Sequence, residues 1–230
     1  MRHWIIANGL SLKNTPLELL KDEVTWGMNR IHLHYKNTEW RPTYYLMIDF
    51  NQQNKPIDYW KECIRAHWDT PKFLWDGFRR GDKGYLDLGD GIGEVPNTTW
   101  LSRCKKHHYY MGDNYRKRAE SWHFPEICTA FSGIGAMMQL AVLHGATELC
   151  VVGADLYGPD YRKNFFTPDY TDDQRPRDTL DNINMNQVHA VARRSSPVPI
   201  YNCTFGGKLE VHPRKDFYEV LGEKETYRTG

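Results

Sequence analysis

Short apolar runs in this chain are each followed by amide, hydroxyl or carboxylate side chains. Such runs are typical of buried strands, and in open parallel sheets ligands bind beyond the carboxyl ends of the strands. A few well-placed polar groups of this kind can orient a ribose, a base edge or a phosphate. The residues concerned are Asn8, Gly9, Ser11, Asn29, Asn51 and Asp155. They predict a nucleotide-binding rim, although the same residue types are also common in ordinary turns after strands.

A second candidate for anion binding lies at Ser132 and Gly133, inside the long apolar segment 127–146. Exposed amide groups and the helix dipole at a helix start favour negative charge. A simple helix cap, with the glycine packed closely against a strand, explains the pair equally well.

Other motifs are weaker. The glycines of 89–93 lack a following helix and are typical of a turn. His32 and His34 would share one face of a strand, and His107 is adjacent to His108. Neither histidine pair has a third ligand at the usual spacing, so we expect no metal and no cofactor.

Composition narrows the class of protein. The 230 residues carry a net charge of +1, which argues against a broadly basic nucleic-acid binder. The mean hydropathy of −0.70 and the interrupted apolar segments argue against a membrane span. The five cysteines include no CxxC motif and are typical of reduced residues in a cytoplasmic protein. A homo-oligomer is left open.

Apolar runs and helical patterns alternate along the chain, which predicts an α/β fold with a mainly parallel sheet flanked by helices. We expect one domain over 1–230, with a polar and unpatterned lid at 158–181. The expected strands are 4–7, 24–28, 44–49, 72–75, 149–153 and 198–201. The expected helices are 15–21, 56–68, 127–145 and 184–194.

Four segments resemble one family in the same order. They are Ile5–Leu12, Gly27–Asn29, Thr129–Gly133 and Leu149–Tyr157, and the likeness extends over about residues 3–205. They resemble the small bacterial sialyltransferases, glycosyltransferase family 42. A related group with a similar opening comprises the archaeal-type 6-hydroxymethylpterin diphosphokinases. The resemblance implies a Rossmann-like fold.

The resemblance implies a CMP-sialic acid donor, a glycan or other small acceptor, and chemistry without a metal. It implies that Asn8 and Ser11 line the phosphate and sugar of the donor. It further implies that Asn29 and Asn51 contact the nucleotide and that Ser132 touches the donor.

The resemblance also implies that Tyr157, with Tyr161 or Tyr170, donates hydrogen bonds to the departing phosphate. Negative charge grows on that leaving group, and positioned donors stabilise it. The chain departs from the family where the family places its general base, a histidine of the lid. Here Asp178 and Asp181 are the candidate bases.

Three functions therefore compete. The first is transfer of a sugar from a nucleotide donor. The second is a pterin-type diphosphokinase that uses ATP and Mg²⁺ held by Asp49 and Asp155. The third is a non-catalytic nucleotide-binding protein that has kept the site without its base. The missing lid histidine favours the second and third, whereas the tyrosines and the lack of a phosphate-binding loop motif favour the first.

Overall fold

The computed structural model describes residues 1–48, 57–75, 95–101, 127, 132–156, 165–170 and 179–222. Within these ranges, seven strands form one parallel sheet. The strands are β1 (Arg2–Ile6), β2 (Val24–Met28), β3 (Tyr44–Met47), β4 (Lys72–Trp75), β5 (Thr98–Leu101), β6 (Glu148–Val152) and β7 (Ile200–Asn202). The predicted α/β fold and its parallel strands are confirmed, and the structure adds β5 to the expected strands.

The order of the strands in space is β5-β4-β3-β2-β1-β6-β7. From β1 the chain builds the sheet outward through β5, then returns to the other side of β1 to place β6 and β7. The direction of building thus reverses between β1 and β6. This reversal is the topological switch point, where open α/β sheets bind their ligands.

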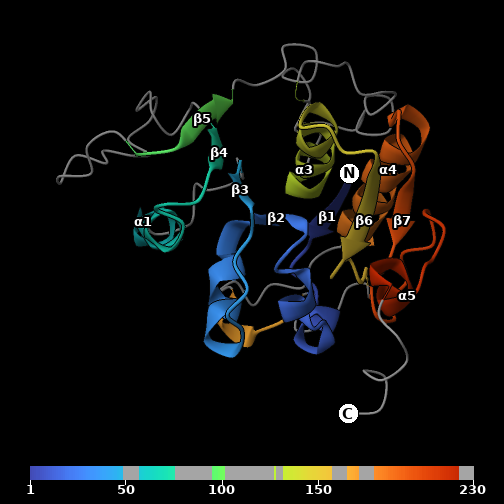
Figure 1. Ribbon diagram of the computed structural model, residues 1–230, viewed down its shortest axis with the longest axis horizontal. Helices are drawn as coiled ribbons and strands as arrows, with labels where there is room; N and C mark the ends of the chain where they lie inside the picture. Colours follow the sequence, from blue (N-terminus) through green and yellow to red (C-terminus); the bar gives the residue numbers. More distant parts are fainter. Residues whose placement is uncertain are drawn as a thin grey trace.

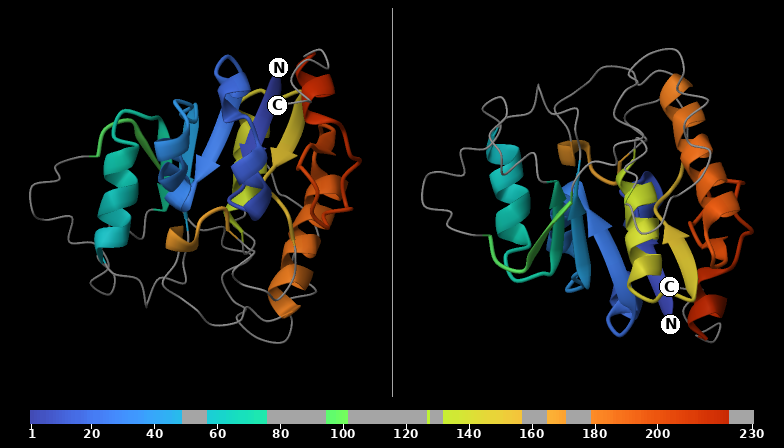
Figure 2. Two further views of the ribbon diagram at one scale, coloured as in Figure 1. Left: turned by 90° about the horizontal axis from the view of Figure 1, so that it is seen from below. Right: turned by 90° about the horizontal axis from the view of Figure 1, so that it is seen from above.

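Helices cover both faces of the sheet (Figures 1 and 2). On one face, α3 (Gly133–Leu143) contacts β1, β2, β3 and α4 (Thr179–Ser195). The other face is covered by three 3-10 helices, η1 (Leu10–Asn14), η2 (Leu17–Leu20) and η3 (Asn29–Asn37), with α1 (Ile57–Ala66) and α5 (Phe217–Leu221). A further 3-10 helix, η8 (Pro168–Tyr170), lies against η3.

A hydrophobic core lies on each face of the sheet, and the side chains of β1 point alternately into one core and the other. Trp4 and Ile6 are fully buried under the 3-10 helices, whereas Ile5 is fully buried under α3 and α4. A strand covered on both faces is a continuous apolar run, which is why the sequence predicted these central strands well.

Several predicted elements differ from the structure. His32 and His34 lie in the 3-10 helix η3 and not on a strand. The helix expected at 15–21 is the 3-10 helix η2, with Pro16 at its N-cap, and the Thr15 hydroxyl donates to the Ser11 carbonyl without capping that helix. The helix expected to run from 56 to 68 ends at Ala66.

The boundaries of two longer helices also shift. The helix expected at 127–145 begins at Gly133, because Ser132 caps its N-terminus. The helix expected at 184–194 already begins at Thr179, so the last residues of the predicted lid, 179–181, belong to α4. Among the described residues, no helix is long and apolar enough to cross a membrane.

Gly153 and Gly145 offer a matched test of the packing at the end of β6. Both residues have positive φ, +70° at Gly153 and +85° at Gly145. A Cβ at Gly153 would lie 2.5 Å from the Ala7 carbonyl oxygen, whereas a Cβ at Gly145 would have no atom within 4 Å. Gly145→Ala should lower the free energy of unfolding by about 1 kcal/mol through strain alone. Gly153→Ala should cost about 2 kcal/mol more because of the collision. Urea denaturation measures both variants, and equal losses would contradict this packing.

Candidate functional site

Asn8 and Asp155 lie just beyond the carboxyl ends of β1 and β6, on either side of the switch point. Backbone pairing continues past both strands, because the Gly9 amide donates to the Gly153 carbonyl at 2.8 Å. The Ser11 amide then donates to Asp155 Oδ2 at 2.8 Å. The loop after β1 is therefore tied directly to the loop after β6.

Gly9 is required by this close approach. A Cβ at Gly9 would lie 2.2 Å from Asp155 Oδ2 and 2.3 Å from the Gly153 carbonyl oxygen. Only a residue without a side chain fits between the two loops. Gly9 thus acts in the site by allowing the loops to meet.

Asp155 combines a structural contact with an unsatisfied atom. Burial raises the pKa of its carboxyl group, although hydrogen bonding from Ser11 opposes this shift. Its second oxygen, Oδ1, is buried and has no hydrogen-bond partner among the described residues. Buried polar atoms are normally paired, so such an atom is typical of a site that another group completes.

Asn8 is buried, and its side chain joins three parts of the chain. Its Nδ2 donates to the Met28 carbonyl at 3.2 Å and to the Tyr170 hydroxyl at 2.9 Å. The Asn8 carbonyl accepts from the Phe166 amide at 3.0 Å. Asn8 Oδ1 is buried and has no partner among the described residues. It is an amide oxygen at the switch point that remains available to a donor.

The contacts of Asn8 also place part of the predicted lid. Phe166 and Tyr170 are both buried, and they pack against the core on the side of the 3-10 helices. Residues 165–170 therefore form a wall next to Asn8. The rest of the segment, apart from 179–181, lies outside the described residues, so its closure over a ligand stays a prediction.

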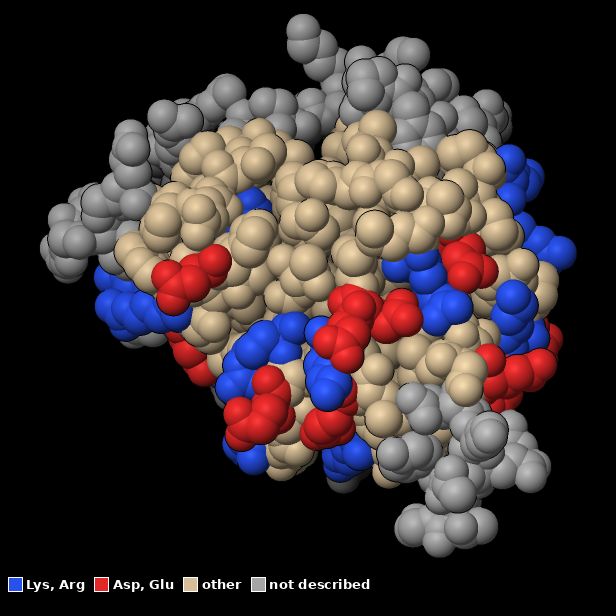
Figure 3. Space-filling model, viewed as in Figure 1, with Lys and Arg blue, Asp and Glu red and all other residues tan. Residues whose placement is uncertain are grey.

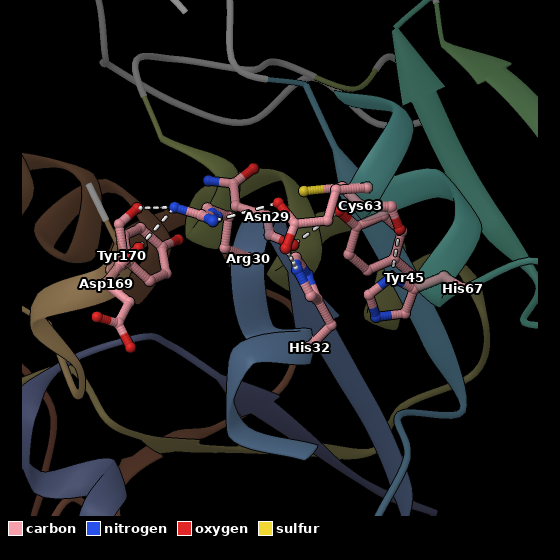
Figure 4. Close-up of polar contacts among 9 residues, drawn as sticks. Asn29, Arg30, His32, Tyr45, Cys63, His67, Asp169 and Tyr170 are labelled. Atoms are coloured by element: carbon pink, nitrogen blue, oxygen red, sulfur yellow. Dashed lines mark hydrogen bonds and ion pairs between the residues drawn. The ribbon is translucent and has the colours of Figure 1, made fainter. Parts of the chain in front are cut away.

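Asn29 begins η3 at the end of β2 in a strained conformation, with φ of +50°. Its carbonyl accepts from the Tyr45 hydroxyl at 2.7 Å. The Tyr45 ring stacks on His67 at 3.7 Å between centroids, and the Cys63 carbonyl holds His67 Nδ1 at 2.7 Å (Figure 4). Strained backbone persists only where its surroundings enforce it, and this stack supplies that support.

Arg30 links the end of β2 to the wall beside Asn8. Its guanidinium donates to the carbonyls of Asp169 and Tyr170 at 2.6 and 3.0 Å (Figure 4). It also pairs with the Glu62 carboxylate at 3.2 Å. Glu62 also contacts His32 Nε2 at 2.9 Å. Arg30 was not among the residues predicted from the sequence, which were the uncharged residues and carboxylates that follow each strand. Its position next to Asn29 was the available signal.

Ser132 and Gly133 approach the same neighbourhood through α3. The Ser132 hydroxyl accepts from the Ile134 amide at 3.2 Å, which is the geometry of an N-cap. A Cβ at Gly133 would lie 2.8 Å from Met28 Sδ. The Met28 carbonyl also accepts a hydrogen bond from Asn8 Nδ2, and Met28 directly precedes Asn29. The structure therefore brings Asn8, Asn29 and the start of α3 together around Met28.

Other predicted site residues are not placed. Asn51, Tyr157, Tyr161 and Asp178 lie outside the described residues, as do Asp49, Gly89–Gly93 and His107–His108. Asp181 belongs to α4, but its side chain is not described. Their proposed roles stay predictions.

His189 lies on α4, the helix that follows the predicted lid, and it is not a surface residue of that helix. It is fully buried and contacts His212 Nε2 through Nδ1 at 2.9 Å. Burial, together with His212, lowers its pKa to about 3. A group so enclosed cannot take a proton from an acceptor.

The described ranges contain no group of three or more His, Cys, Asp or Glu residues that could hold a metal ion. The cysteines placed by the structure, Cys63, Cys150 and Cys203, are buried and form no disulfide bond within the described ranges. The expectation of a metal-free site stays a prediction.

No protein-family model matches the chain, and no curated protein matches it. Among solved structures, it is similar to the MAf glycosyltransferase from Magnetospirillum magneticum AMB-1, with a TM-score of 0.54 and 14% identity. That likeness covers 94% of this chain but 33% of the MAf chain, so this chain spans about a third of that protein.

Two sialyltransferase structures have lower TM-scores. One is CST-II with a trisaccharide acceptor and CMP, with a TM-score of 0.44, 12% identity, and coverage of 95% of this chain and 92% of that chain. The other is CstII from Campylobacter jejuni with CMP-3FNeuAc, with a TM-score of 0.44, 14% identity, and coverage of 88% and 81%. The likeness to the MAf protein supports the conclusion that this parallel sheet has a glycosyltransferase-like, Rossmann-type fold.

Proposed function

We propose that this chain is a glycosyltransferase-like protein that binds a nucleotide-activated sugar at the switch point between β1 and β6. The observation that carries the proposal is the convergence of Asn8, Asn29 and the start of α3 around Met28. The similarity in fold to the MAf glycosyltransferase supports the same class of activity.

The chemistry of this rim suits a nucleotide with one phosphate. Asn8 offers a buried amide oxygen without a partner in the described structure, which can accept from a base or a ribose hydroxyl. The N-terminus of α3 offers backbone amides and a positive dipole end to a phosphate. We therefore favour a donor of the CMP-sialic acid type, with a glycan or another small molecule as acceptor.

Transfer forms a bond between the acceptor oxygen and the anomeric carbon and breaks the bond between that carbon and the phosphate oxygen. The nucleotide leaves with its phosphate, and the acceptor hydroxyl loses its proton. In this proposal, Tyr157 and Tyr161 donate hydrogen bonds to the departing phosphate, as the family resemblance implies. Asp178 or Asp181 accepts the proton of the acceptor. Asn51 completes the contacts to the nucleotide.

The diphosphokinase alternative needs Asp155 as a ligand of Mg²⁺. In the structure, one oxygen of Asp155 accepts from the Ser11 amide, and burial raises the pKa of the carboxyl group. Burial weakens Asp155 as a metal ligand, since a metal requires the deprotonated form, although the hydrogen bond from Ser11 favours that form. The geometry therefore favours sugar transfer over ATP-dependent chemistry.

Asn29 allows a sharp test of nucleotide binding, because glycine tolerates its positive φ. Asn29→Gly removes the amide but keeps the backbone, and it should weaken CMP binding about tenfold, roughly the worth of one hydrogen bond. Asn97→Gly is the matched control, since Asn97 has φ of +51° in the connection before β5. Calorimetric titration with CMP in EDTA measures both variants.

The same titration separates the alternatives when CDP, UDP, GDP and ATP are included, with and without Mg²⁺. We expect CMP to bind best and to bind without Mg²⁺. A preference for ATP with Mg²⁺ would favour the diphosphokinase. Equal effects of the two glycine variants would contradict the placement of the nucleotide at Asn29.

Catalysis is tested at Tyr157. Tyr157→Phe removes one donor to the leaving phosphate and should lower turnover about 10²-fold while CMP affinity stays nearly unchanged. Tyr218→Phe is a control, because Tyr218 lies on α5, away from the strand ends that form the site. Transfer is followed as release of CMP from CMP-sialic acid. Binding of CMP without any transfer or hydrolysis would support the non-catalytic alternative.

A further inference from the structure

A cavity of about 240 Å³ opens between η1, η3 and the wall at 165–170. Its lining includes Lys13 of η1, His34 and Lys36 of η3, and Phe166, Thr167 and Pro168 of the wall. None of these residues belongs to the predicted nucleotide site. The cavity therefore needs an explanation of its own.

Two ammonium groups line this cavity, and neither is strongly committed elsewhere. Lys13 forms no ion pair with any described residue, and Lys36 pairs with Asp169 Oδ2 at 3.5 Å. Both side chains of that pair are 64% exposed, and such exposed ion pairs contribute little to stability. Lys and Arg are interspersed with Asp and Glu on the face shown in Figure 3, so attraction for an anion must be local.

His34 is the most deeply buried polar residue of the lining. It is 5% exposed, and its Nδ1 has no hydrogen-bond partner among the described residues. Burial lowers its pKa, although the nearby Glu18 carboxylate opposes this, so the ring is neutral at pH 7. A neutral imidazole serves as donor or acceptor for a hydroxyl group.

Phe166 and Pro168 add apolar surface to the lining, beside the polar residues Thr167 and Asn37. The Phe166 ring meets His34 edge-on, with 5.1 Å between centroids, and Pro168 lies beside it in the lining. Cations, a neutral hydrogen-bonding ring and flat apolar walls together suit a molecule with charge, hydroxyls and C–H faces. The volume is slightly below that of pockets for drug-sized ligands, which points to a ligand of one sugar ring.

We propose that this cavity binds an anionic monosaccharide, a sugar ring that carries a phosphate or a carboxylate. Lys13 and Lys36 attract the anionic group, and Phe166 and Pro168 cover a face of the ring. This site goes beyond the proposed donor site but shares a wall with it, since the Phe166 amide donates to the Asn8 carbonyl. The two ligands should bind at the same time.

Calorimetric titration of the full chain without nucleotide tests the proposal. The probes are glucose 6-phosphate, glucuronate and uncharged glucose, and they distinguish a phosphate from a carboxylate and both from a neutral sugar. At least one anionic sugar should bind, and it should bind at least tenfold more tightly than glucose. Binding of glucose as tight as that of the anions, or no binding of any probe, would overturn the proposal.

Charge variants locate the binding. The double variant Lys13→Gln and Lys36→Gln should weaken the anionic sugar at least tenfold, whereas Lys21→Gln, on an exposed lysine outside the lining, should not. Asp169→Asn should strengthen binding a few-fold, because it removes the carboxylate that competes for Lys36. Equal losses for the double variant and Lys21→Gln would overturn the proposal, as would weaker binding to Asp169→Asn.

CMP titrations of the same variants keep the two proposals distinguishable. The lysine variants should bind CMP as the unaltered chain does. If the unaltered chain fails to bind CMP but binds the anionic sugar, the donor-site proposal falls and the cavity stands. If CMP competes with the anionic sugar, the cavity is not a separate site.

Discussion

The close approach of two loops beyond β1 and β6 determines the rest of the site. Ala7 and Gly9 continue the strand pairing through hydrogen bonds to Val152 and Gly153 at 2.9 and 2.8 Å. Neither glycine position has room for a Cβ, and the carboxylate of Asp155 closes the junction on the Ser11 amide. The direction of η1 and the place of Asn8 follow from this junction.

Backbone strain is concentrated next to this junction. Among the described residues, the non-glycine residues with positive φ are Asn29, Asn97 and Leu156. Asn29 and Leu156 lie beyond the ends of β2 and β6, at the rim that we assign to the nucleotide. Strain of this kind is often stored where a fold presents functional groups.

The sequence predicted the sheet well, because strands buried on both faces are continuous apolar runs such as Leu149–Val152. The sequence predicted the 3-10 helices poorly, because such short turns leave no periodic pattern of apolar residues. His32, for example, was wrongly assigned to a strand and lies in η3. Asn8, Asn29 and Ser132 could be found because they follow strands or start a helix. The contact of Asn8 with Tyr170 could not, because it joins residues 162 positions apart.

The central claim is that a nucleotide occupies the rim around Met28. It is tested most directly by following the backbone amide signals of the labelled chain by NMR while CMP is added in EDTA. We expect the largest changes at Gly9, Asn29 and Gly133, while Thr98–Leu101 at the far edge of the sheet stays unchanged. Changes confined to the cavity beside Lys13, or no changes at saturating CMP, would show that no nucleotide occupies this rim.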